Sequence, residues 1–159
     1  MVQNVVRRWR VASFVAAAAL VVACSGIKSQ TNSFATLAEA QEAGAITSGW
    51  IPEGLPPGAH DLREGHVPGT RHRWGLFEYP QTEEATLRGL LQPDEIRGET
   101  GRSEVPARIE WWPLMLRGQL DTDRLATTGV RMYRAKQGDL LYAVNWNQGR
   151  AYYWSPAAE

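Results

Sequence analysis

Residues 129–154 read GVRMYRAKQGDLLYAVNWNQGRAYYW, and this stretch is the clearest structural signal in the chain. Its apolar runs are rich in valine and aromatic residues, which favour β-strands. The tripeptides at 137–139 and 147–149 combine glycine with asparagine, aspartate or glutamine, a composition typical of turns. The sequence therefore predicts a three-stranded antiparallel meander over residues 129–135, 140–146 and 150–154.

A second β region is expected further upstream. Residues 61–67 alternate weakly between apolar and polar side chains, and Pro68-Gly69-Thr70-Arg71 has the composition of a turn. Residues 73–79 alternate again and place aromatic side chains on one face. The two segments predict a β-hairpin whose aromatic face points inward.

Two short helices are expected beside the strands. Thr36 and Glu39 are spaced as in a capping box, which predicts a helix over residues 37–43 that ends at Gly44. Thr82 is predicted to cap a second helix, in which Leu87, Leu90 and Leu91 form one apolar stripe. The sequence Gln92-Pro93 is expected to end that helix.

The remaining segments complete the predicted architecture. Residues 49–58 contain three prolines and predict an ordered extended loop. Residues 94–105 are charged and predict irregular structure, whereas residues 107–112 predict a strand that Pro113 ends. The fold class is α+β, a single domain over residues 34–159 in which an antiparallel hairpin and a C-terminal three-stranded meander pack with two short helices.

The N-terminus has the features of an export signal. Arg7, Arg8 and Arg10 precede an apolar run over residues 11–23, and Cys24 follows a small residue. The run of 13 residues would form a helix of about 20 Å, short of the roughly 30 Å of a bilayer core. An uncleaved anchor or plain secretion are the alternatives to cleavage.

With cysteine at the cleavage point, this segment resembles a bacterial lipoprotein signal. The resemblance implies removal of residues 1–23, acylation of Cys24 (palmitate among the lipids) and a tether over residues 24–33. We expect the protein on the cell membrane or the outer membrane, facing the periplasm or the exterior. Ser25 resembles the outer-membrane sorting choice where the cell has two membranes.

Composition excludes several classes of function. Loss of the signal leaves 14 basic against 17 acidic residues, which argues against a nucleic-acid partner. Cys24 is the only cysteine, so no disulfide within the chain is expected and a packed core must supply the stability. Six of the seven tryptophans lie after the signal and can supply much of that core.

No metal site or cofactor is predicted. His60, His66 and His72 recur every six residues, but six residues of strand separate two side chains by about 20 Å, so we expect solvated histidines of the hairpin. Asp121-Thr122-Asp123 resembles the start of a calcium loop. Because no glutamate follows at its end, the three residues are expected to cap a helix or loop.

No catalytic residue is predicted either. The chain has no Gly-x-Ser-x-Gly sequence and no glycine-rich phosphate loop. Glu64, Glu78 and Glu110 could pair as general acid and base only if the fold brought two of them together.

Tryptophan offers the best candidates for a contact surface. Most of the tryptophans are expected in the core, but Trp50 or Trp111 could form an exposed aromatic anchor for a partner. Neighbouring side chains on a strand point to opposite faces. Trp111 and Trp112 are therefore expected to separate, with one of them available for contact.

Scattered motifs carry a family resemblance. They are Thr36-Leu37-Ala38-Glu39-Ala40, Gly49-Trp50-Ile51-Pro52, Leu55-Pro56, Arg63-Glu64-Gly65-His66, Trp74-Gly75-Leu76-Phe77, Trp111-Trp112-Pro113 and Tyr152-Tyr153-Trp154. Together they resemble the YbbD-like family of small bacterial lipoproteins. The chain departs from the family at residues 68–72, where an acidic and polar run is expected. The resemblance implies a fold and a cellular location, but it implies no activity.

Three functions remain open at this point. The first is a membrane-anchored envelope lipoprotein that binds a protein or glycan partner, or has a structural role, without catalysis. The second is an immunity or inhibitor protein that binds a protein toxin or enzyme, and the third is a hydrolase of glycan or cell wall. The sequence does not identify the ligand, the oligomeric state or the membrane.

Overall fold

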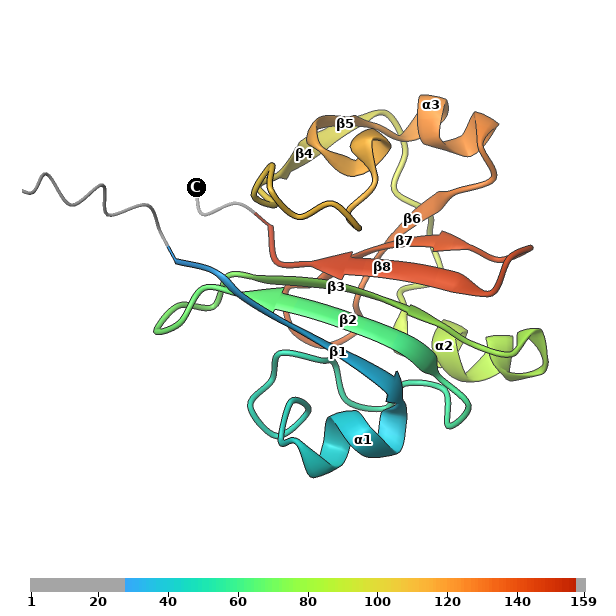
Figure 1. The fold of residues 1–159 in the computed structure, drawn as a ribbon. Helices are drawn as coiled ribbons and strands as arrows, with labels where there is room; N and C mark the ends of the chain where they lie inside the picture. Colours follow the sequence, from blue (N-terminus) through green and yellow to red (C-terminus); the bar gives the residue numbers. More distant parts are fainter. Residues whose placement is uncertain (1–27, 157–159) are drawn as a thin grey trace, which may run out of the picture.

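A computed structural model describes residues 28–156 of the chain (Figure 1). Its strands are Gln30–Thr36 (β1), His60–His66 (β2), Arg73–Glu78 (β3), Glu99–Ser103 (β4), Gly118–Asp121 (β5), Arg131–Arg134 (β6), Leu141–Asn145 (β7) and Arg150–Trp154 (β8). Its helices are Leu37–Glu42 (α1), Glu84–Leu90 (α2) and Thr122–Thr127 (α3), and short 3₁₀ turns cover Gln81–Glu83 and Leu114–Leu116.

Six strands form one antiparallel sheet in the order β1-β2-β3-β8-β7-β6, and β4 pairs with β5 in a separate two-stranded sheet. The predicted hairpin is β2–β3 and the predicted meander is β6–β7–β8, so the α+β assignment is confirmed. Strand β8 pairs with both β3 and β7. It therefore joins the hairpin and the meander into a single sheet.

Both faces of the large sheet are covered (Figure 1). The face toward α1 and α2 packs a cluster that includes Leu62, Phe77 and Tyr153. The opposite face packs against the lobe that carries β4, β5 and α3, through a cluster that includes Trp74 and Trp154. Alternate residues of β3 and β8 therefore enter two different cores.

The two predicted helices are present, and one of them starts differently. Thr36 caps α1, where its hydroxyl accepts from the Glu39 N–H at 3.2 Å while Glu39 accepts from the Ala35 N–H at 2.8 Å. The prediction that Thr82 caps α2 was wrong, because Thr82 lies inside the 3₁₀ turn that precedes this helix. Leu91 is buried but lies beyond the helix, where it bridges to Ala135.

The strand predicted over residues 107–112 is absent, and turns occupy that segment. Arg117 explains the difference, because its guanidinium donates to three carbonyl oxygens of the loop, those of Pro106, Ile109 and Trp112. These charge-assisted bonds hold the backbone in turns and satisfy carbonyls that a strand would have paired with a neighbour.

Two segments expected to lack regular structure contain strands. Residues 30–33 were placed in the tether, but they form the first part of β1, which pairs with β2. Residues 94–105 were expected to be irregular, yet they include β4, whose partner β5 lies much later in the chain. In both cases the pairing partner is distant in sequence and leaves no local pattern.

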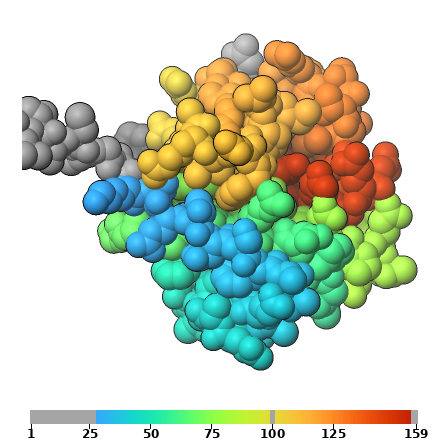
Figure 2. Space-filling model, in the orientation of Figure 1, coloured from blue at the N-terminus to red at the C-terminus, as the bar shows by residue number. Residues whose placement is uncertain are grey.

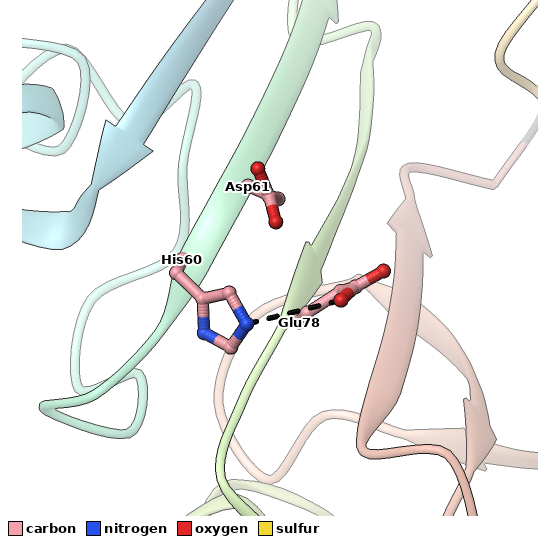
Figure 3. A group of neighbouring side chains, drawn as sticks. All are labelled: His60, Asp61 and Glu78. Atoms are coloured by element: carbon pink, nitrogen blue, oxygen red, sulfur yellow. Dashed lines mark ion pairs between the residues drawn. The ribbon is translucent and has the colours of Figure 1, made fainter.

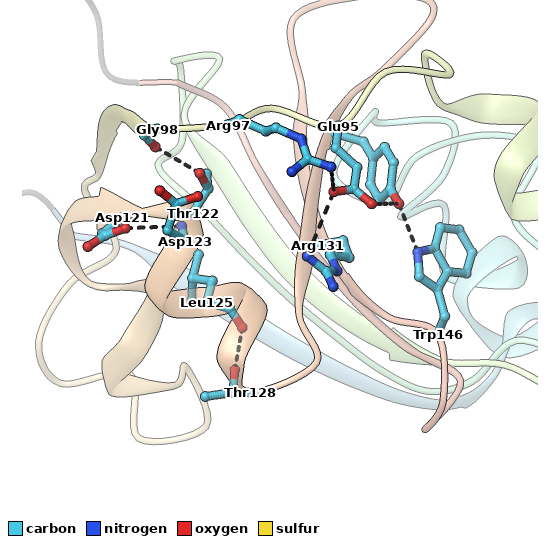
Figure 4. Close-up of polar contacts among 11 residues, drawn as sticks. Glu95, Arg97, Gly98, Asp121, Thr122, Asp123, Leu125, Thr128, Arg131 and Trp146 are labelled. Atoms are coloured by element: carbon cyan, nitrogen blue, oxygen red, sulfur yellow. Dashed lines mark hydrogen bonds and ion pairs between the residues drawn. The ribbon is translucent and has the colours of Figure 1, made fainter.

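Polar contacts hold α3 and the segment before β4 together within the β4–β5 lobe (Figure 4). Asp121 caps α3 by accepting from the N–H groups of Asp123 and Arg124, as predicted for this acidic run. The Thr122 hydroxyl donates to the Gly98 carbonyl at 2.8 Å. Among residues 28–156, no helix is both long and apolar enough to cross a membrane.

Removing either central tryptophan is expected to destabilise the domain strongly. Trp74 and Trp154 are fully buried, as predicted, and truncation of a core aromatic to alanine costs about 3–5 kcal/mol. The indole N–H of each lacks a hydrogen-bond partner within the described chain, so substitution by phenylalanine loses no hydrogen bond and should cost less. Urea unfolding followed by circular dichroism measures both changes.

The matched control for this experiment is Leu114→Ala. Leu114 is 84% exposed, and its truncation should leave the unfolding midpoint within error of the unsubstituted protein. If Trp74→Ala or Trp154→Ala gave the same midpoint as Leu114→Ala, these side chains would not stabilise the fold as described.

Candidate binding site

An open pocket of about 360 Å³ lies over β2, β3 and β8, beside the loop of residues 104–117. It is called the charged pocket below, and it is lined by Asp61, Arg63, Leu76, Glu78, Trp111, Arg150 and Tyr152. Because Leu76, Glu78 and Tyr152 share the sheet face of Trp74, the pocket is the part of that face which the β4–β5 lobe leaves open.

A β-bulge positions two of the charged groups. His60 pairs with Glu78 and Arg63 pairs with Leu76, so β2 has one more residue than β3 between these points. Asp61 occupies the bulge with φ 48°, a left-handed conformation that is uncommon for a residue other than glycine. The extra residue allows His60, Asp61 and Arg63 to lie on the same side of the sheet.

Glu78 and Arg150 form the floor of the charged pocket. They face each other across β3 and β8, and the Arg150 side chain donates to one Glu78 oxygen through both Nε, at 3.0 Å, and Nη2. The hydrogen bonds to Glu78 raise the pKa of Arg150. The charges of Glu78 and Arg150 neutralise each other, and the two bonded side chains form the base of the pocket.

Three potential metal ligands meet at the end of the charged pocket. Figure 3 shows His60, Asp61 and Glu78, whose donor atoms all lie within 4.8 Å of one another. His60 Nε2 is 3.8 Å from the second Glu78 oxygen, and His60 Nδ1 is 3.0 Å from the Gly58 carbonyl. The guanidinium of Arg150 is already bound to Glu78, so a metal ion at this carboxylate would be repelled by a neighbouring positive charge. The electrostatics therefore favour a ligand other than a metal ion.

Asp61 and Arg63 carry charges that have no ion-pair partner in the described part of the chain. Both side chains are exposed, and neither forms an ion pair with another residue between 28 and 156. Carboxylate and guanidinium groups bind ligands through charge-assisted hydrogen bonds. The wall of the charged pocket therefore presents one free negative and one free positive group.

Aromatic rings complete the rim. Trp111 is half-buried and meets the fully buried Trp112 edge-on, with ring centroids 6.1 Å apart. Tyr152 packs edge-on against the other side of Trp112 at 5.7 Å. The predicted separation of the two adjacent tryptophans was wrong, because a turn in place of a strand lets both rings pack against the same core cluster. Trp112 is buried there, and Trp111 lines the pocket.

A second polar cluster lies on the opposite sheet face and is buried. The Glu64 side chain has no exposed surface and accepts from Asn32 on β1 with one oxygen. Its other oxygen lies 2.9 Å from Nδ1 of His66, whose ring stacks on Trp50 at 3.9 Å. The expectation of solvated histidines was therefore wrong for His66, which Trp50 covers.

Trp50 is held from two sides. His66 occupies one face of its ring, and the Tyr153 hydroxyl donates to its carbonyl oxygen at 2.9 Å. Burial raises the pKa of Tyr153, so that this hydroxyl stays protonated and keeps donating. A partner contact through Trp50 stays a prediction.

The carboxylates considered as an acid–base pair do not converge. Glu64 points into the core on the α1 side, whereas Glu78 lies on the other sheet face in the charged pocket. Glu110 is exposed and does not line that pocket. The sequence missed Asp61, Arg63 and Arg150, because only the bulge and the strand pairing bring them together.

Loss of the buried carboxylate is expected to destabilise the domain. Glu64→Ala removes the acceptor of the exposed Asn32 amide and leaves the buried His66 ring without its partner, which should cost about 1–3 kcal/mol. Exposed Glu110→Ala is the matched control and should change stability by less than about 0.5 kcal/mol. Equal urea midpoints for the two variants would contradict the described cluster.

Comparison with known proteins agrees with the resemblance in the sequence. Residues 28–78 match the family model of the YbbD head domain, which covers α1 and the strands β1, β2 and β3. No curated protein and no solved structure matches the chain. The matched part contains Asp61, Arg63 and Glu78 of the charged pocket, whereas Trp111, Arg150 and Tyr152 lie beyond it. Residues 28–78 are therefore similar to the YbbD head domain.

Proposed function

We propose that this protein is a lipid-anchored lipoprotein of the bacterial envelope that binds, without catalysis, a small polar ligand of the envelope in the charged pocket. The observation that carries the binding role is the pocket itself, a concave site with charged walls and an aromatic rim. Its volume lies within the range of small-molecule sites, about 300–1,000 Å³.

The anchor is supported by the sequence around Cys24. A basic segment, a short apolar run and a cysteine after Val21-Val22-Ala23 fit removal of residues 1–23 and acylation of the new N-terminus. Strand β1 starts at Gln30, so only a few residues separate Cys24 from the domain. The domain would therefore stay close to the membrane surface.

The pocket favours binding over hydrolysis. A glycoside hydrolase needs one carboxylic acid that stays protonated, which burial in an apolar site favours. Asp61 is exposed to water, and Glu78 is bound to Arg150, so neither carboxyl group lies in an apolar site. The lining residues contain no serine, threonine or cysteine that could act as a nucleophile.

A protein partner is the second candidate, and one observation favours it. Leu114 and Met115 are the large exposed hydrophobic residues of the described chain, at 84% and 45% exposure. They line an open groove of about 570 Å³ on the β4–β5 lobe. An immunity or inhibitor protein would use such a surface to bind a toxin or an enzyme.

Acylation of Cys24 is directly testable. Cells fed a fatty-acid analogue should label the unsubstituted protein, and Cys24→Ser should abolish the label because the thiol is the site of attachment. Expression of both forms is checked by immunoblot. Equal labelling of the two forms would refute the anchor.

Binding in the charged pocket is expected to depend on Trp111. We expect soluble glycan–peptide fragments of the cell wall to bind the purified protein, and Trp111→Ala to weaken their affinity at least ten-fold through loss of the aromatic rim. Calorimetry measures the affinity. Trp146→Ala, which removes another half-buried tryptophan, is the matched control and should bind normally. Equal affinities for the two variants would argue against the pocket.

A further inference from the structure

We propose that the ligand of the charged pocket is a zwitterion, an α-amino acid or a short peptide that carries both an ammonium and a carboxylate group. In this arrangement Asp61 binds the ammonium group and Arg63 binds the carboxylate. The inference rests on the proposed binding role of the pocket and specifies the chemistry of what binds there.

The charge balance of the pocket leads to this ligand. Its lining contains two carboxylates and two guanidiniums, of which Glu78 and Arg150 satisfy each other. Asp61 and Arg63 remain, with opposite charges and no partner in the described chain. A simple anion would meet repulsion from Asp61, and a simple cation would meet repulsion from Arg63. A ligand with both charges satisfies both groups.

The bulge in β2 makes this arrangement geometrically reasonable. Residues two apart on a strand are about 6.6 Å apart along its axis, and the long arginine side chain can bend back toward the aspartate. Arg63 can therefore hold a carboxylate in a bidentate bond while the shorter Asp61 accepts from an ammonium group beside it. The left-handed backbone at Asp61 is the local strain that keeps its carboxylate on this face.

The rest of the pocket gives the ligand an apolar contact. Trp111 and Tyr152 line the same pocket as the free charges, and Leu76 lies between Arg63 and Tyr152 on the sheet. An aliphatic side chain on the ligand's α-carbon would pack against these residues, and the indole face would attract the ammonium group. Alanine, with one methyl group, is the smallest probe that contains all three features.

The experiment uses the purified lipoprotein in detergent micelles, with binding followed by NMR shifts of the tryptophan indole N–H groups. The probes are alanine, N-acetylalanine, which lacks the ammonium group, and alaninamide, which lacks the carboxylate. We expect alanine to shift the Trp111 resonance, and each blocked probe to bind at least ten-fold more weakly.

Variants assign each charge to its residue. Asp61→Asn keeps a residue that tolerates positive φ, and it should weaken alanine at least ten-fold but strengthen N-acetylalanine, which Asp61 repels. Arg63→Gln should weaken alanine equally but strengthen alaninamide, which Arg63 repels. The exposed pair Arg71 and Asp139, 3.7 Å apart on two turns, provides matched controls. Arg71→Gln and Asp139→Asn should bind alanine like the unsubstituted protein.

Several outcomes would overturn the proposal. One is an alanine titration to high millimolar concentration that leaves the Trp111 resonance in place. Another is a loss of alaninamide binding in Arg63→Gln as large as the loss of alanine binding. If alanyl-alanine binds more tightly than alanine, the natural ligand is a short peptide. If alanyl-alanine binds more weakly than alanine, the natural ligand is a free amino acid. Wall fragments that bind through Trp111 without competition from alanine would leave the proposed function intact and reject the zwitterion alone.

Discussion

The whole domain depends on β8, the strand that pairs with β3 on one side and β7 on the other. Without it the N-terminal hairpin and the C-terminal meander would be two separate pieces, each too small to bury its own core. The side chains of β8 alternate accordingly. Trp154 enters the core under the β4–β5 lobe, whereas Tyr153 enters the core on the α1 side. This central pairing joins β3 in the middle of the chain to β8 near the end of the described residues, so the sheet forms as one cooperative unit.

Coverage of both sheet faces determines where a ligand can bind. On the α1 side, the polar groups of Glu64 and His66 are satisfied internally and stacked beneath Trp50. On the other side, the β4–β5 lobe covers Trp74 and Trp154 but leaves the end of the sheet near Glu78 open. The polar groups of the first face stabilise the fold, and the charges of the open end remain available to a ligand. The same sheet thus separates the buried polar cluster of Glu64 and His66 from the exposed charges of the charged pocket.

Local patterns predicted much of the fold, and long-range pairing explains what they missed. The meander and the capping box at Thr36 depend on neighbours in sequence, and both are confirmed. Strand β4 depends on β5, and the turns at 107–112 depend on Arg117, so neither leaves a local signal. The burial of His66 likewise requires Trp50, sixteen positions earlier in the sequence. Of the charged pocket, the sequence singled out Trp111 and Glu78 but missed Asp61 and Arg150, because these two come together through register and a bulge.

The loop of residues 104–117 links the N-terminal end of the described domain to the charged pocket. Arg108 in this loop donates to the backbone and hydroxyl oxygens of Ser29, which lies just before β1, and Figure 2 shows the N-terminal strand and this part of the chain in contact on one face. The same loop holds Trp111 at the pocket rim, and Arg117 fixes its turns. A lipid on Cys24 would therefore restrain the position of the loop as well as that of the domain. The aromatic rim is then placed at a set distance from the membrane, which suits a site that collects ligands from the layer next to the lipid surface.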